Sequence, residues 1–105
     1  MIEGALEVRR QLVTVKPGQW VTSTAGRDNG SHYLVLEVVD DNAITVVDGE
    51  RRTLAKPKRK NLRHVWVHDV VQSALAQAFE QGEKVSDEDI RRALKELVQK
   101  QEEVS

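Results

Sequence analysis

Seven lysine and arginine side chains lie between residues 51 and 64, with no acidic residue among them. Clustered cations suit phosphate binding, because each phosphate that they neutralise releases condensed counterions. The alternative is an ordinary edge strand and loop, in which lysine and proline protect the sheet from aggregation. Given the density of cations, we favour contact with RNA. The candidate cations are Arg51, Arg52, Lys56, Lys58, Arg59, Lys60 and Arg63. Only one of Arg51 and Arg52 is expected to join a single patch, because successive strand residues face opposite sides.

The loop over residues 25 to 31 is a second candidate for RNA contact. Its glycines, Gly26 and Gly30, permit positive φ and a close approach of the backbone to a ligand, although a tight connection needs them for geometry alone. We expect Arg27 and Ser31 to contact a phosphate or a sugar hydroxyl. The loop is not a P-loop, because the GxxxxGK[ST] pattern and its lysine are missing.

Exposed aromatic rings often read single-stranded RNA by stacking. Strand alternation places Tyr33 opposite the leucine and valine stripe of its own segment, so Tyr33 is the best candidate for an exposed ring. Trp20 and Trp66 are assigned to packing. His32, beside the glycine loop, is expected to hydrogen-bond RNA, and His64 to extend the basic patch.

Neither a catalytic site nor a metal site is expected, and no cofactor is implied. His64 and His68 would lie about 13 Å apart on an extended strand, which is too far for one metal ion. The chain has no cysteine, which excludes a disulfide, a thiolate ligand and a cysteine nucleophile. The acids at 40–41 and 87–89 fall in a turn and at a helix start, without a base or nucleophile as partner.

Charge is divided unevenly along the 105 residues. Residues 1–68 carry a formal charge of +3 and residues 69–105 carry −4, although the whole chain carries only −1. Such asymmetry is more informative than the mean. No apolar run has the length of a signal peptide or a membrane span, so we expect a soluble cytoplasmic protein.

The spacing of apolar and turn residues predicts several short strands followed by two helices. The expected strands are 19–24, 32–39, 43–47, 50–54 and 62–67, with Asp48-Gly49 as a two-residue type I′ hairpin between the third and fourth. The expected helices are 70–81, ended by Gly82, and a second one that begins after the N-cap Ser86. The fold class is mainly β with C-terminal helices, as a small SH3-like five-stranded barrel followed by two α-helices. Residues 1–15 form a poorly defined segment, 16–68 the barrel, and 69–105 a helical hairpin or tail.

These residues resemble the KOW-domain RNA-binding proteins, especially small bacterial ones related to large-subunit ribosomal proteins fourteen-e, six-e and twenty-seven-e. The resemblance covers residues 16–68. It rests on Pro17-Gly18-Gln19-Trp20-Val21, Ala25-Gly26-Arg27-Asp28 with Gly30, the strand from Tyr33 to Val39, Asp48-Gly49, and Lys56-Pro57-Lys58-Arg59-Lys60 with Leu62 and His64. Asn29 stands where the family usually has a lysine, which removes one cation from the loop. The resemblance implies a barrel that binds RNA, most of all ribosomal RNA.

The leading hypothesis is a non-enzymatic RNA-binding protein that contacts structured RNA through its backbone and shape. Changing Lys58, Arg59 and Lys60 together to glutamate should then abolish RNA retention and leave the fold intact. The rival is a protein-interaction module of a transcription or translation complex, without direct RNA contact. In either case the C-terminal helices are available to ribosomal or other proteins, and the oligomeric state is open. Salt separates the two hypotheses, because phosphate binding weakens steeply as salt rises.

Overall fold

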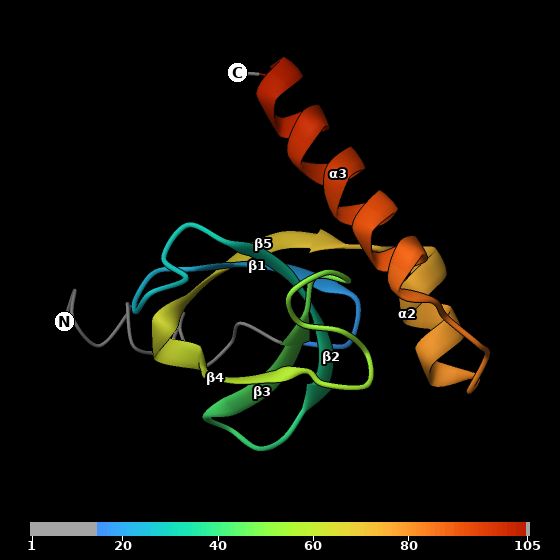
Figure 1. The fold of residues 1–105 in the computed structure, drawn as a ribbon, viewed down its shortest axis with the longest axis horizontal. Coiled ribbons are helices and arrows are strands. Elements are labelled where there is room, and N and C mark those ends of the chain that lie inside the picture. The colour runs from blue at the N-terminus through green and yellow to red at the C-terminus, as the bar shows by residue number, and fades with distance from the viewer. Residues whose placement is uncertain (1–14, 105) are drawn as a thin grey trace, which may run out of the picture.

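The computed structural model describes residues 15–104, as a five-stranded antiparallel sheet with two α-helices (Figure 1). The strands are β1 (Gln19–Ser23), β2 (His32–Val38), β3 (Ala43–Val47), β4 (Lys58–Asn61) and β5 (Val65–Val71). The 3₁₀ turn η1 (Leu62–His64) joins β4 to β5, and the helices are α2 (Ser73–Glu80) and α3 (Asp87–Val104). The predicted mainly β class with C-terminal helices is therefore confirmed. All but the last residue of the predicted N-terminal segment 1–15 lies outside the described residues.

The sheet has the strand order β4-β3-β2-β1-β5, so β4 and β5 are its two edges. It curls strongly, and η1 connects the two edge strands at one end of the curl (Figure 1). At that end the backbone N–H of Thr24, just after β1, donates to the His64 carbonyl at 2.9 Å. Full closure into an SH3-like barrel stays a prediction, as does the division of the chain into domains.

Both faces of the sheet are covered, because strand alternation supplies two apolar stripes. One stripe fills the inside of the curl with Val21, Tyr33, Val35, Ile44 and Val46. The other stripe lies under the helices and comprises Trp20, Leu34 and Val47, which cluster with Leu75 of α2 and with Ile90, Ala93 and Leu94 of α3. Two separate cores therefore share the same three central strands.

Three of the predicted strands, 19–24, 32–39 and 43–47, are confirmed to within one residue. The predicted strand 50–54 and its type I′ hairpin are wrong. A type I′ turn needs positive φ at both central residues, and among the described residues only glycines have it, so Asp48 does not. Instead, the Asp48 carboxylate accepts hydrogen bonds from the backbone N–H groups of Glu50 and Arg52, at 2.9 and 2.8 Å. Residues 48–57 form a loop, and the fourth strand begins at Lys58.

The helix boundaries follow local capping chemistry. Ser86 accepts from the Asp89 backbone N–H at 3.1 Å, while the Asp89 carboxylate accepts from the Ser86 N–H at 3.0 Å, which is the reciprocal pattern of a capping box. Gly82, with φ +69°, ends α2 as predicted. The first turns of α3 lie near the sheet, Leu97 and Val98 further along still pack against the core, and the helix then extends to the C-terminus (Figure 1). Within the described residues, neither helix has the length and apolar character needed to cross a membrane.

Candidate functional site

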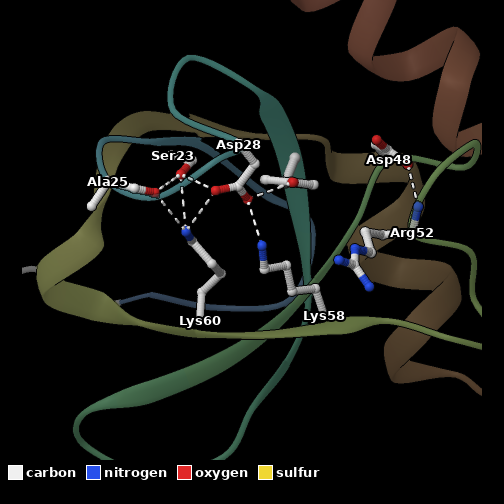
Figure 2. Close-up of polar contacts among 8 residues, drawn as sticks. Ser23, Ala25, Asp28, Asp48, Arg52, Lys58 and Lys60 are labelled. Atoms are coloured by element: carbon white, nitrogen blue, oxygen red, sulfur yellow. Dashed lines mark hydrogen bonds and ion pairs between the residues drawn. The ribbon is translucent and has the colours of Figure 1, made fainter.

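Two of the seven tract cations, Lys58 and Lys60, converge on Asp28 of the glycine loop (Figure 2). The Lys60 ammonium donates to Asp28 Oδ1 at 3.1 Å, to Ser23 Oγ at 2.9 Å and to the Ala25 carbonyl at 3.3 Å. Lys58 donates to Asp28 Oδ2 at 3.1 Å. The Lys60 side chain is only 7% exposed and that of Lys58 is 28% exposed. Strand β4 therefore uses these two cations to hold the glycine loop.

Lys58 and Lys60 were both predicted to contact RNA, but the structure directs both ammonium groups at Asp28, with Lys60 buried and Lys58 half-buried. Residues of a strand alternate between faces, so Lys58 and Lys60 share the inner face while Arg59 points outward. Reversing all three charges would place two glutamates against Asp28, so we expect this variant to lose stability and not to keep its fold. A variant that tests RNA contact must leave Lys58 and Lys60 intact.

Asp28 is the acceptor at the centre of this cluster. Burial opposes its ionisation, but hydrogen bonds from Tyr33, Lys58, Ser23 and Lys60 outweigh burial and hold the pKa of Asp28 well below its usual range. The Tyr33 hydroxyl donates to Asp28 Oδ2 at 2.7 Å. Burial, together with this bond to a carboxylate, raises the pKa of Tyr33 to about 12. The cluster thus joins two lysines to one carboxylate and one neutral phenol, so the carboxylate balances only one of the two cations.

The other five cations of the tract are exposed: Arg51, Arg52, Lys56, Arg59 and Arg63. They come from the 48–57 loop, from β4 and from η1, which are consecutive along the chain. Both Arg51 and Arg52 are exposed, since they lie in a loop and not on a strand. Arg59 has one acidic neighbour, Asp40 at 4.0 Å, and both groups are more than half exposed, so the pair is weak.

The 48–57 loop is fixed against the start of α3. The Arg91 guanidinium donates to the Gly49 carbonyl, and the Leu54 backbone N–H donates to the Asp87 carboxylate at 2.8 Å. Gly49 is buried with φ +78°, and a Cβ there would fall against the Asp87 carbonyl oxygen and 2.9 Å from Arg91 Cγ. The helix therefore determines where the loop presents its cations.

The glycine loop has the backbone geometry that its sequence predicts. Gly26 and Gly30 have φ of +86° and +92°, and Arg27 between them is exposed. The Ser31 backbone N–H donates to the Asp28 carbonyl at 2.8 Å, and Ser31 is half-buried. Because Asp28 is held by β4, Arg27 is carried by the same anchored loop.

The predicted roles of the aromatic residues are partly reversed. Tyr33 is 3% exposed, so the prediction of an exposed ring there is wrong. It lies opposite the Leu34 stripe as expected, but that face of the sheet is the inside of the curl. Trp20 is buried as predicted, whereas Trp66 is 64% exposed and does not belong to the core. Its neighbours Val65 and Val67 face inward, and this alternation is the sequence signal that indicates an outward Trp66.

His32 and His68 form a polar cluster with Trp20 and Thr22, which the sequence analysis did not predict. The Trp20 ring stacks on His68, with centroids 3.7 Å apart and planes 12° apart. The Trp20 indole N–H donates to His32 Nδ1 at 3.1 Å, and Thr22 Oγ1 lies 2.9 Å from the same nitrogen. Thr22 Oγ1 also lies 2.7 Å from His68 Nε2.

An indole N–H can only donate, so His32 Nδ1 must be an acceptor and His32 is neutral, with its proton on Nε2. Thr22 has one hydroxyl proton, and when that proton is directed at His32 the Thr22 oxygen accepts from the Nε2–H of His68. Burial lowers the pKa of His32, although Glu102 acts in the opposite direction. Burial and the neighbouring His32 lower the pKa of His68. In the described part of the chain no three His, Cys, Asp or Glu side chains are grouped to hold a metal ion.

An open groove of about 440 Å³ lies beside this cluster. Trp66, His32 and His68 line it on the sheet side, and Val98 and Glu102 line it on the side of α3. None of the five exposed cations lines the groove. Trp66, which does line it, follows Arg63 by three residues in the chain.

The chain is similar to the large ribosomal subunit protein eL14 of Hyperthermus butylicus. The two are 26% identical over 85 residues, which cover 81% of this chain and 80% of that protein. No protein-family model matches the chain. The predicted resemblance to ribosomal proteins is thereby confirmed in its coarse form, while membership of a bacterial KOW-domain group stays a prediction.

Proposed function

We propose that this protein is a non-enzymatic, cytoplasmic RNA-binding protein that contacts structured ribosomal RNA, or acts in a ribosome-associated complex. The observation that carries the proposal is the exposure of Arg51, Arg52, Lys56, Arg59 and Arg63, in a stretch without any acidic residue. The similarity to a large ribosomal subunit protein over most of both chains supports the ribosomal context. The proposal includes the interpretation of the curled sheet as an SH3-like KOW domain.

The five exposed cations suit phosphates better than they suit base edges. Arginine and lysine bind phosphate oxygens and fix the register of the protein on the nucleic acid, without reading sequence directly. Structured RNA presents phosphates and 2′-hydroxyls, while the bases of an A-form duplex are poorly accessible in the deep major groove. Arg27 and Ser31 on the anchored glycine loop, with His32 at its end, extend the proposed interface.

Lys58, Lys60 and Tyr33 take an indirect role in this proposal. They bind Asp28 and so fix the loop that carries Arg27. We expect substitutions of these three residues to change folding before they change any RNA contact.

The test is charge reversal of the exposed cations alone. Lys56, Arg59 and Arg63 would be changed together to glutamate, and the matched control would change the exposed Lys84, Lys95 and Lys100 of the helical region. Both variants alter the net charge equally. We expect the first to lose most of its retention of purified large-subunit ribosomal RNA at moderate salt, and the second to keep it. Equal retention by the two variants would overturn the proposal, provided that circular dichroism gives the same folded signal for both.

A second candidate is a protein-interaction module of a transcription or translation complex. It is favoured by α3, whose residues Lys95, Glu96, Gln99 and Lys100 form an exposed polar side available to a protein partner. A salt titration separates the candidates: the logarithm of an RNA association constant falls linearly with the logarithm of salt, with a slope close to the number of phosphates neutralised. A flat titration with ribosomal RNA would favour the second candidate.

A further inference from the structure

We propose that the groove between β5 and the C-terminal half of α3 accepts an unpaired nucleobase, which stacks on Trp66. The inference rests on the proposed RNA-binding function and adds to it a site for one base. The lining of the groove contains none of the five exposed cations, and Arg63 is the one that lies closest to it along the chain.

Trp66 is the most exposed of the large hydrophobic residues in the described part of the chain, at 64%. It lies opposite Thr22 of β1, on the face of β5 that is turned away from the inner core. A single exposed hydrophobic side chain needs no explanation by itself. Here, however, the indole borders a groove of about 440 Å³, which is within the size range of small-ligand sites.

The floor of the groove is fixed before any ligand arrives. Thr22, His32 and His68 are joined by hydrogen bonds of 2.7 and 2.9 Å, and the Trp20 ring is stacked on His68. These contacts hold both rings in place, and His32 Nδ1 is an acceptor because it meets the Trp20 indole N–H. A ligand therefore meets a preformed floor with polar ring edges, and little conformational entropy is lost at the protein on binding.

Charge around the groove favours a base inside it and a phosphate outside it. The Glu102 carboxylate lines the side of α3 and would repel a phosphate. Arg63 and His64 are exposed just before Trp66 in the chain, where a phosphate would find a cation. A nucleotide so placed directs its base over the indole and its phosphate toward Arg63. Every nucleobase has a flat π face, so stacking of this kind tolerates different sequences.

The experiment compares three RNA hairpins that differ in one feature. One has a blunt end, one carries a single-stranded extension, and one carries the same extension without bases. We expect wild-type protein to bind the second hairpin most tightly. Trp66→Ala should lose about tenfold in affinity for the second hairpin, which corresponds to roughly 1.4 kcal/mol of stacking, and should leave the other two unchanged. Trp66→Phe should retain most of the difference, because phenylalanine also stacks.

Several outcomes would overturn the inference. Unchanged affinity of Trp66→Ala for the extended hairpin would show that the groove does not bind a base, and would not affect the proposed function. An equal loss for all three hairpins would mean that Trp66 supports folding and not a base. Quenching of tryptophan fluorescence by an arginine-rich peptide but not by the extended hairpin, seen in wild type and lost in Trp66→Phe, would assign the groove to a cationic protein segment. Absence of wild-type binding to every hairpin and to ribosomal RNA would overturn the proposed function together with the groove.

Discussion

Lys60 keeps an ammonium group almost entirely out of water, and it does so by donating to oxygen atoms of Asp28, Ser23 and Ala25. Removal of a buried charge from water costs several kcal/mol, which its partners must offset. The stability of this cluster depends on one residue, because the Asp28 carboxylate pairs with both Lys58 and Lys60. Loss of that carboxylate would leave a buried cation without a counter-charge.

We therefore predict that Asp28→Ala lowers the free energy of unfolding by roughly 3–5 kcal/mol. Urea denaturation would measure it. Arg59→Ala on the same strand is the control, and should change stability by less than about 0.5 kcal/mol, because Arg59 is exposed and its pairing with Asp40 is weak. Similar stabilities for the two variants would mean that the ion cluster does not support the fold.

His32 and His68 make stability depend on pH. Burial lowers the pKa of both imidazoles below their ordinary value of 6.5, so the unfolded chain binds more protons than the folded chain near that pH. Their contribution to stability is present above about pH 6.5 and is lost as the pH falls toward the folded-state values. Protonation of His32 on Nδ1 would also displace the Trp20 indole and the Thr22 hydroxyl.

We predict that the free energy of unfolding decreases between about pH 7.5 and about pH 5, and that His32→Gln weakens this decrease. Glutamine keeps an acceptor for the indole and does not titrate. His64→Gln should leave the pH dependence unaltered, because His64 is exposed. An identical pH profile for wild type and His32→Gln, measured by denaturation at each pH, would refute the assigned protonation states.

Between elements, the contact that connects the helices with the proposed RNA interface is the one between the 48–57 loop and the first turns of α3. Gly49 allows it, because the loop backbone touches the Asp87 carbonyl where any side chain would intrude. Gly30 offers a matched comparison. It has a similar positive φ of +92°, but a Cβ there would meet nothing within 4 Å.

We predict that Gly30→Ala costs about 1 kcal/mol of stability, which is the backbone strain alone. Gly49→Ala should cost clearly more, on the order of 2–4 kcal/mol, because strain and overlap add. Thermal unfolding would measure both. Gly49→Ala should also weaken RNA binding at temperatures where the variant is still folded, since the loop would leave its place on α3. Equal costs for the two variants would show that the loop relaxes freely from the helix.

Elements with strong local signals were predictable from the sequence, and elements defined by distant contacts were not. The first three strands, the Ser86 cap and the Gly82 stop depend on neighbouring residues, and all are confirmed. Local spacing predicts a hairpin at Asp48-Gly49, because the docking of the 48–57 loop on Arg91 is a distant contact that local spacing does not encode. Alternation correctly placed Tyr33 and Leu34 on opposite faces. It gives the wrong exposure for Tyr33, because the curl of the sheet buries the face that carries Tyr33 while the helices bury the opposite face that carries Leu34.

The same reason limits what the sequence revealed of the candidate site. The cationic tract was recognised as a cluster, but five of its seven members are exposed and two are held by Asp28. Asp28 lies in a loop about thirty residues before these lysines, and nothing in the local sequence indicates that it pairs with them. The exposed Trp66 and the His32–His68 cluster likewise result from the approach of β1, β2 and β5, which no local pattern encodes.

Across the whole molecule, positive and negative charge are divided between the sheet segment and the helical segment, at +3 and −4. The two parts are joined closely, since the start of α3 touches the cationic loop. RNA that approaches the five exposed cations therefore also experiences the acids of the helices. Repulsion over such distances operates through solvent and is screened by salt, with a Debye length of about 10 Å at 0.1 M.

We predict that neutralising exposed acids of the helical segment strengthens RNA binding, and does so only at low salt. The variant would carry Glu80→Gln, Glu83→Gln and Glu96→Gln, all at exposed positions. Its affinity for large-subunit ribosomal RNA should rise about two- to fivefold near 0.05 M salt and should match wild type near about 0.5 M, where the Debye length is only a few ångströms. A gain that persists at high salt would mean that these glutamates contact the RNA directly. A loss of affinity at low salt would mean that these glutamates contribute favourably to RNA binding, and would indicate that the RNA binds at the helices.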